Sequence, residues 1–267
     1  MALKAILVHL DHTARCEHRL DLAIALARNH QAHLCGYYAT DNLWYTHAAA
    51  TEEFTAASMH SLLRHKAAQA GIAADWIDGS AVEPVTMPVI DKLTQHACYA
   101  DLVIVGQLDT GSGGQGLSSD FPERIAMTSG RPVLVIPRRG EFSSLGDRVM
   151  VAWRGGRASS RALHDAIPIL RKAQHVNLMM VNPSDSFQSE AENLCAYLAW
   201  NSIKATWNRI ADAELSTGNI LLNQACDLGI DLLVVGLLSI SHRGKAVPGP
   251  VGRHLLDFMT IPILMSG

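Results

Sequence analysis

DLVIVG at Asp101–Gly106 and DLLVVG at Asp231–Gly236 are two copies of one pattern, 130 positions apart. Each copy has an acidic residue, a short run of branched aliphatic residues and a final glycine. A short apolar run bounded by turn-forming residues is typical of a strand buried on both faces of a parallel sheet. The sequence therefore predicts one such strand in each half of the chain.

Two further matches surround this pattern. GRPVLVIP at Gly130–Pro137 matches TIPILM at Thr260–Met265, again at an offset of 130. Ala5–Arg28 aligns with Arg148–Arg171 at an offset of 143, so the first half has 13 more residues, expected around Leu43–Ser58. Three matches in the same order predict a domain that is duplicated within the chain.

Strand-like runs alternate with amphipathic segments in both halves. Apolar residues at i, i+3, i+4 and i+7 predict the first helix of each half: Leu20, Ala23, Ile24 and Ala27, then Leu163, Ala166, Ile167 and Leu170. Further helices are expected at Thr55–Gln69, Pro84–Cys98, Glu190–Asn201 and Thr217–Leu228.

This alternation predicts the α/β class. We expect two tandem doubly wound domains, each a five-stranded, mostly parallel sheet flanked by helices. Domain 1 is expected at residues 1–137, a polar linker at 138–147 and domain 2 at 148–267.

The composition excludes several classes of protein. The 267 residues are 48% hydrophobic and 18% charged, with a net charge of −3, which does not fit a nucleic-acid-binding protein. No apolar run reaches the roughly 18 residues of a membrane span. The five cysteines are widely spaced and include no C-x-x-C, so neither a disulfide framework nor a cysteine zinc site is expected. We expect a cytoplasmic protein with no nucleic-acid or membrane partner.

Candidate binding residues follow the predicted strands, because ligands of doubly wound sheets bind at the carboxyl ends of the strands. In the second half these positions include Ala152, Trp153 and Arg154 after the first strand, and Val181 at the end of the second. Gly236 ends DLLVVG itself, and the loop and helix after it add Ser239, Gly249, Pro250 and Val251.

With these loops the chain resembles the universal stress protein family in its tandem form, over nearly all of its length. The resemblance implies the adenine-nucleotide-hydrolase-like fold. ATP-binding members carry G-x2-G-x9-G-(S/T) after the fourth strand, an Asp after the first strand near the adenosine, and backbone at the second strand for the adenine. The nine candidates above would then bind ATP or AMP, with Mg²⁺. This chain departs from the pattern at Ser239, Pro250 and Arg154, which replace a glycine, the Ser/Thr and the Asp.

The first half keeps Asp11 but has Asp109, Ser119 and Asp120 at the loop positions. Two carboxylates there would repel a polyphosphate, so we expect no triphosphate in this half. By the resemblance, Val133–Ile136 and Ile261–Met265 would pair within the chain and form an intramolecular pseudo-dimer. Further dimerisation of whole chains stays open.

Other motifs favour structural roles. Gly111, Gly113 and Gly116 spell G-x-G-x-x-G but lie away from a strand-to-helix turn, so a dinucleotide site is not expected. No metal site or catalytic residue is predicted, and histidines are expected mainly at the surface and at helix ends. Trp153 is expected to pack in the interior, as are Cys98 and Cys226.

Two functions remain open from the sequence. One is a non-enzymatic stress-response or regulatory protein with an adenine-nucleotide site in the second domain. The other is a scaffold of the same fold that has lost the nucleotide and acts through an unknown protein partner. A third hypothesis is an enzyme of the same architecture with adenylation, electron-transfer or weak ATP-hydrolysis activity.

Overall fold

The computed structural model describes residues 2–13, 15–39, 55–79, 87–107, 120–183, 187–212, 214–240 and 246–267. For 238–240 and 246–248 only the backbone is described. The chain divides into two compact units, Ala2–Arg138 and Arg139–Gly267, called the N-terminal and C-terminal units below. The division falls at the start of the expected linker.

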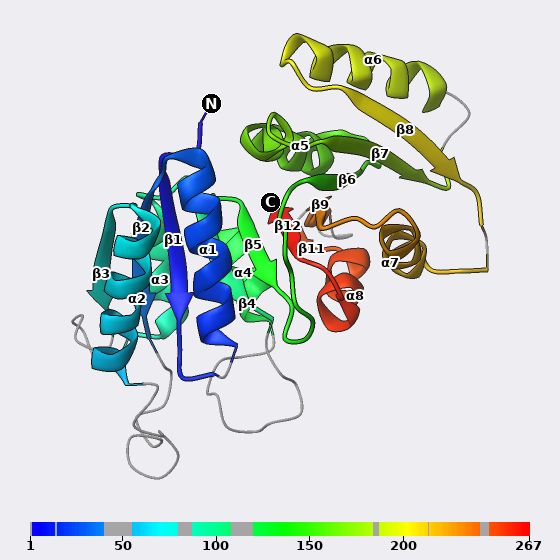
Figure 1. Ribbon diagram of the computed structural model, residues 1–267. Helices are drawn as coiled ribbons and strands as arrows, with labels where there is room; N and C mark the ends of the chain where they lie inside the picture. Colours follow the sequence, from blue (N-terminus) through cyan, green and yellow to red (C-terminus); the bar gives the residue numbers. More distant parts are fainter. Residues whose placement is uncertain are drawn as a thin grey trace. The chain divides into compact units, whose positions relative to one another are not determined.

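The N-terminal unit is a parallel sheet in the order β3-β2-β1-β4-β5. Helices α1 and α2 cover one face, and α3 and α4 cover the other (Figure 1). Its elements are β1 (Ala5–Leu10), α1 (Cys16–His30), β2 (His33–Tyr38), α2 (Ala56–Ala70), β3 (Ala74–Asp78), α3 (Val89–Ala97), β4 (Leu102–Gly106), α4 (Phe121–Thr128) and β5 (Val133–Ile136).

The C-terminal unit repeats this arrangement in the order β8-β7-β6-β9-β12, again with parallel neighbours. It adds a short antiparallel ribbon, β10-β11. Its elements are β6 (Arg148–Ala152), α5 (Gly156–Leu170), β7 (His175–Val181), α6 (Phe187–Trp200), β8 (Ala205–Ile210), α7 (Thr217–Asp227), β9 (Leu232–Gly236), β10 (Leu238–Ile240), β11 (Ala246–Pro248), α8 (Pro250–Phe258) and β12 (Ile263–Ser266).

The register of the strands confirms the predicted fold class and its duplication. Ile6 on β1 pairs with Leu102 on β4, and Val149 on β6 pairs with Leu232 on β9. These two pairs are related by the same offsets, 143 and 130, that the sequence shows. The N-terminal unit has its extra residues mainly between β2 and α2, where residues 39–55 correspond to only 182–186 in the C-terminal unit. Part of the expected insertion, residues 43–54, lies outside the described residues.

The aspartate of the duplicated pattern fastens two strands together. Asp101 Oδ2 accepts hydrogen bonds from the backbone N–H groups of Lys4 and Ala5 at 2.7 and 3.0 Å. Asp231 accepts one from the Ser144 hydroxyl at 2.7 Å and three from backbone N–H groups at 3.0 Å. Those N–H groups belong to Gly146, Asp147 and Arg148. The acidic residue of the pattern therefore has a structural role: it joins the start of one strand to the start of a neighbouring strand that is distant in sequence.

Several local expectations differ from the structure. Helix α3 begins at Val89, later than expected, because Pro88 is in an extended conformation at its N-cap. Helix α6 begins earlier, at Phe187, whose ring packs edge-on against Trp207. Cys98 and Cys226, expected in the interior, are both exposed.

None of the helices in the described part of the chain has the length and apolar character needed to cross a bilayer. The pairing of the last strands of the two halves stays a prediction.

Candidate functional site

The C-terminal unit has a cavity of about 350 Å³ at the carboxyl ends of its strands. It lies where β6, β7 and β9 end and where α5, α7 and α8 begin. Its lining includes every nucleotide-binding candidate except Ser239: Ala152, Trp153, Arg154, Val181, Gly236, Gly249, Pro250 and Val251. Ser239 lies opposite Val247 in the β10-β11 ribbon, and its side chain is outside the described part.

The floor of the cavity is apolar. Met179, Leu221 and Val235 line it, and each is at most 5% exposed. Met179 and Val235 lie near the carboxyl ends of β7 and β9. The floor therefore suits a flat, weakly polar group.

Trp153 forms one wall and is only half-buried, which corrects the expectation of an interior tryptophan. Its indole Nε1 donates a hydrogen bond to Glu190 Oε1 at 2.8 Å. On the α6 side, an open pocket of about 410 Å³ is lined by Trp153, Ser189, Glu190, Asn193 and Leu194. The indole therefore borders two cavities while Glu190 fixes its polar edge.

The turn into α5 and its first residues bring two arginines to the rim. Gly155 and Gly156 have φ values of +76° and +75°, which an L side chain rarely adopts. The backbone N–H of Arg154 donates a hydrogen bond to Ser159 Oγ at 3.3 Å, so Ser159 supports the start of the helix. Arg154 and Arg157 are exposed and line the cavity, and no acidic residue is among its described lining residues. The rim thus favours an anionic group.

Gly236 has a packing role. A Cβ atom there would lie only 2.5 Å from the backbone carbonyl carbon of Ala158 and 2.8 Å from the Ser159 nitrogen. Only glycine allows α5 to approach β9 this closely. Its presence is therefore explained without a phosphate.

The start of α8 provides fewer phosphate donors than the glycine pattern implies. The Gly249 N–H already donates to the Leu237 carbonyl at 2.9 Å. Pro250, the first residue of α8, has no N–H. Within the described residues the helix has no side-chain cap, so the next amides, Val251 and Gly252, are those that can meet an anion in the cavity. A phosphate site here would be centred on these two amides and on the arginine rim.

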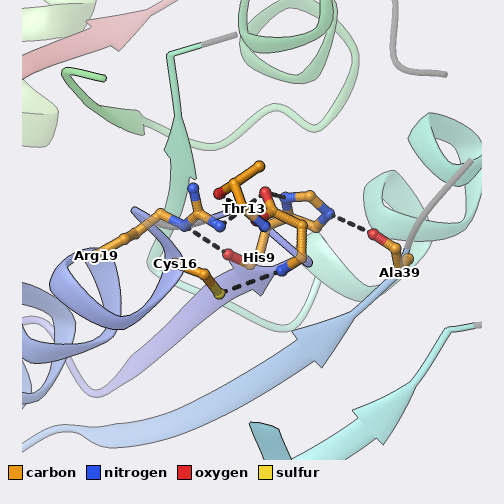
Figure 2. Close-up of polar contacts among 6 residues, drawn as sticks. His9, Thr13, Cys16, Arg19 and Ala39 are labelled. Atoms are coloured by element: carbon orange, nitrogen blue, oxygen red, sulfur yellow. Dashed lines mark hydrogen bonds and ion pairs between the residues drawn. The ribbon is translucent and has the colours of Figure 1, made fainter. Parts of the chain in front are cut away.

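The corresponding end of the N-terminal unit holds a buried polar cluster (Figure 2). Asp11 forms an ion pair with Arg19 at 2.8 Å, and both side chains are nearly inaccessible. Arg19 Nε also donates to the His9 carbonyl at 2.8 Å. His9 is 1% exposed and contacts the Ala39 carbonyl at 3.0 Å, so the expected surface position is wrong for this histidine. Asp11 is therefore engaged by the protein itself.

Burial shifts the protonation equilibria of this cluster. It lowers the pKa of His9 from 6.5 to about 4, with Arg19 acting in the same direction and Asp11 against it. Burial alone would raise the pKa of Asp11, but the positive charge of Arg19 and the Thr13 hydrogen bonds lower it to about 2. Near neutral pH, His9 is neutral and Asp11 is ionised.

These shifts predict a stability that falls with acid. The unfolded chain takes up a proton at His9 below about pH 6.5, whereas the folded chain resists it until about pH 4. We expect His9 to contribute about 3 kcal/mol of stability at neutral pH that is lost across this window. Urea unfolding from pH 7 to 4 should show a shallower decline in His9→Asn than in the wild type. Equal declines would contradict the buried neutral imidazole.

The other first-half candidates are only partly described. Asp109, Gly111, Gly113, Gly116 and Ser119 lie outside the described residues. Asp120 is the N-cap residue of α4, and its buried Oδ1 has no hydrogen-bond partner among the described residues. Within the described ranges, no group of three His, Cys, Asp or Glu side chains is placed to hold a metal ion.

Solved structures similar to this chain show its fold. A universal stress protein from Archaeoglobus fulgidus DSM 4304 aligns over 98% of this chain and 97% of its own, with a TM-score of 0.71 and 14% identity. A protein of unknown function from Pseudomonas aeruginosa PAO1 aligns over 99% of this chain and 92% of its own, with a TM-score of 0.62 and 13% identity. The cytoplasmic domain of a prokaryotic cation chloride cotransporter aligns over 99% of this chain and 95% of its own, with a TM-score of 0.56 and 10% identity.

These alignments confirm the predicted universal stress protein fold over the length of two domains. No family model matches the sequence, and no curated protein matches it.

Proposed function

We propose that the chain is a non-enzymatic stress-response or regulatory protein whose C-terminal unit binds an adenine nucleotide. The observation that carries the proposal is the cavity itself, which gathers residues from three strand ends and three helix starts at one place. A cytoplasmic location and a protein partner that responds to the bound state are part of the proposal.

The chemistry of the cavity supports a nucleotide with its base on the apolar floor. The base would lie beside Met179 and the end of β7 at Val181, with Trp153 as a wall. The phosphate would then face Arg154, Arg157 and the amides at the start of α8. The small number of amide donors favours AMP over ATP, because a longer phosphate chain would find few additional partners among the described lining residues.

Binding without turnover is the expected role. The described lining contains no aspartate or glutamate that could act as a general base or hold Mg²⁺. The alternative is a scaffold that no longer binds nucleotide. The occupied Gly249 amide and the packing role of Gly236 favour that alternative, so a binding measurement has to separate the two.

Thermal unfolding with AMP, ADP and ATP, each with and without Mg²⁺, tests the proposal. A ligand at 100 times its Kd stabilises by about 2.7 kcal/mol. For one unit this is a rise in Tm of roughly 5–15 °C. The rise should disappear when Arg154→Glu and Arg157→Glu are combined, since two carboxylates would then face the phosphate.

Lys204→Glu is the matched control, because it reverses an exposed charge in the same unit away from the cavity lining. It should keep the full nucleotide response. If millimolar nucleotide leaves the wild-type Tm unchanged and none is retained through purification, the nucleotide site is refuted and the scaffold function stands.

A further inference from the structure

Two side chains differ greatly in size between the equivalent ends of the two units. The offsets that relate the strands and helices place His9 opposite Ala152 and Phe121 opposite Val251. The strand registers place Ala39, just beyond β2, opposite Val181. In the C-terminal unit, Ala152, Val181 and Val251 line the cavity.

In the N-terminal unit the larger side chains fill this position. The His9 ring extends from β1 to the chain just beyond β2, where Nε2 lies 3.0 Å from the Ala39 carbonyl oxygen. The ring also packs against the Phe121 ring, with centroids 5.3 Å apart. His9 and Phe121 are 1% and 2% exposed. A planar heterocycle of the protein's own thus lies where Ala152 borders the cavity in the C-terminal unit.

We infer that the N-terminal unit contains a latent binding site for a small, neutral N–H heterocycle, which the imidazole of His9 fills. The inference concerns the other unit from the proposed nucleotide site and does not depend on it. The site consists of the Ala39 carbonyl, the Phe121 ring and the end of β1.

The hydrogen bond defines the ligand class. A carbonyl oxygen only accepts, so Nε2 of His9 carries the proton and donates it to Ala39. The opposite nitrogen, Nδ1, lies 3.9 Å from Asp11 Oδ2, whose charge is balanced by Arg19. A ligand that replaces the imidazole must therefore be planar, uncharged and able to donate one N–H.

His9→Ala installs the residue found at this position in the C-terminal unit and tests the inference with imidazole as the probe. At pH 8 imidazole is mostly neutral. We expect the variant to lose Tm and millimolar imidazole to restore about half or more of the loss, because the probe binds only the folded state. 1-Methylimidazole, which has no N–H, should restore much less.

His33→Ala is the matched control, since His33 lies on the neighbouring strand with its side chain 43% exposed. Imidazole should not restore its Tm. A response of His9→Ala no larger than that of His33→Ala, or an equal response to 1-methylimidazole, overturns the inference. If His9→Ala does not fold in buffer, soluble yield after dilution from urea replaces Tm, and a yield unchanged by imidazole overturns it as well.

Discussion

Asp11→Asn should lower the free energy of unfolding by about 3–5 kcal/mol, the range seen when one partner of a buried ion pair is removed. Asp11 Oδ1 accepts hydrogen bonds from the Thr13 N–H and hydroxyl at 2.9 and 2.6 Å. The amide oxygen of Asn can still accept both. The loss therefore comes from Arg19, which is 3% exposed and would keep its charge without a counter-ion. Urea unfolding at pH 7 measures it.

Asp21→Asn is the control for this prediction. Asp21 lies on the same helix as Arg19 and pairs with Lys66 at 2.6 Å, but its side chain is 50% exposed. An exposed pair contributes about 0–1 kcal/mol, so this variant should be close to wild type. Equal losses in the two variants would show that burial does not determine the strength of the Asp11–Arg19 pair.

Asp231→Ala should cost about 2–4 kcal/mol, since hydrogen bonds to a charged acceptor contribute about 1.5–3 kcal/mol each and are not additive. Three of its four donors are backbone N–H groups at the start of β6 and just before it. Without these hydrogen bonds, the residues that lead into β6 would lose their anchor, and the pairing of β6 with β9 would weaken at that end. Urea unfolding gives the size of the loss, and hydrogen exchange should place it at residues 144–148.

Asp101→Ala is the internal comparison, because Asp101 has the same place in the repeat but, among the described residues, accepts two backbone hydrogen bonds, from Lys4 and Ala5. It should lose less stability than Asp231→Ala. If Asp101→Ala lowered the free energy of unfolding more than Asp231→Ala does, the loss would not follow the number of hydrogen bonds that each aspartate accepts, and the prediction would be wrong.

The fold could be predicted from the sequence because its signals are local and occur twice. Short windows of sequence contain the apolar runs of β4 and β9 and the helical periodicity after β1 and β6. The two constant offsets then show that these local signals recur in the same order. Helix starts were less predictable, since Pro88 and Phe187 act through a cap geometry and a tertiary contact.

The position of the candidate site was predictable, but the state of its groups was not. Parallel strands must end at one edge, which brings Ala152, Val181 and Gly236 together. Whether an amide is free depends on partners distant in sequence, as Gly249 shows by donating to Leu237. The burial of His9 likewise depends on Ala39 and Phe121, which no pattern around His9 indicates.

Gly236 has a consequence for how phosphate-loop motifs are used in genome searches. The close approach of Ala158 and Ser159 maintains a glycine at this position whether or not any ligand binds. Selection for packing alone can therefore preserve the first glycine of the motif in chains that no longer bind a nucleotide. A search that scores this glycine as a sign of ligand binding will count such chains as binders. The later positions, where a residue such as Pro250 removes a donor, are the ones that discriminate.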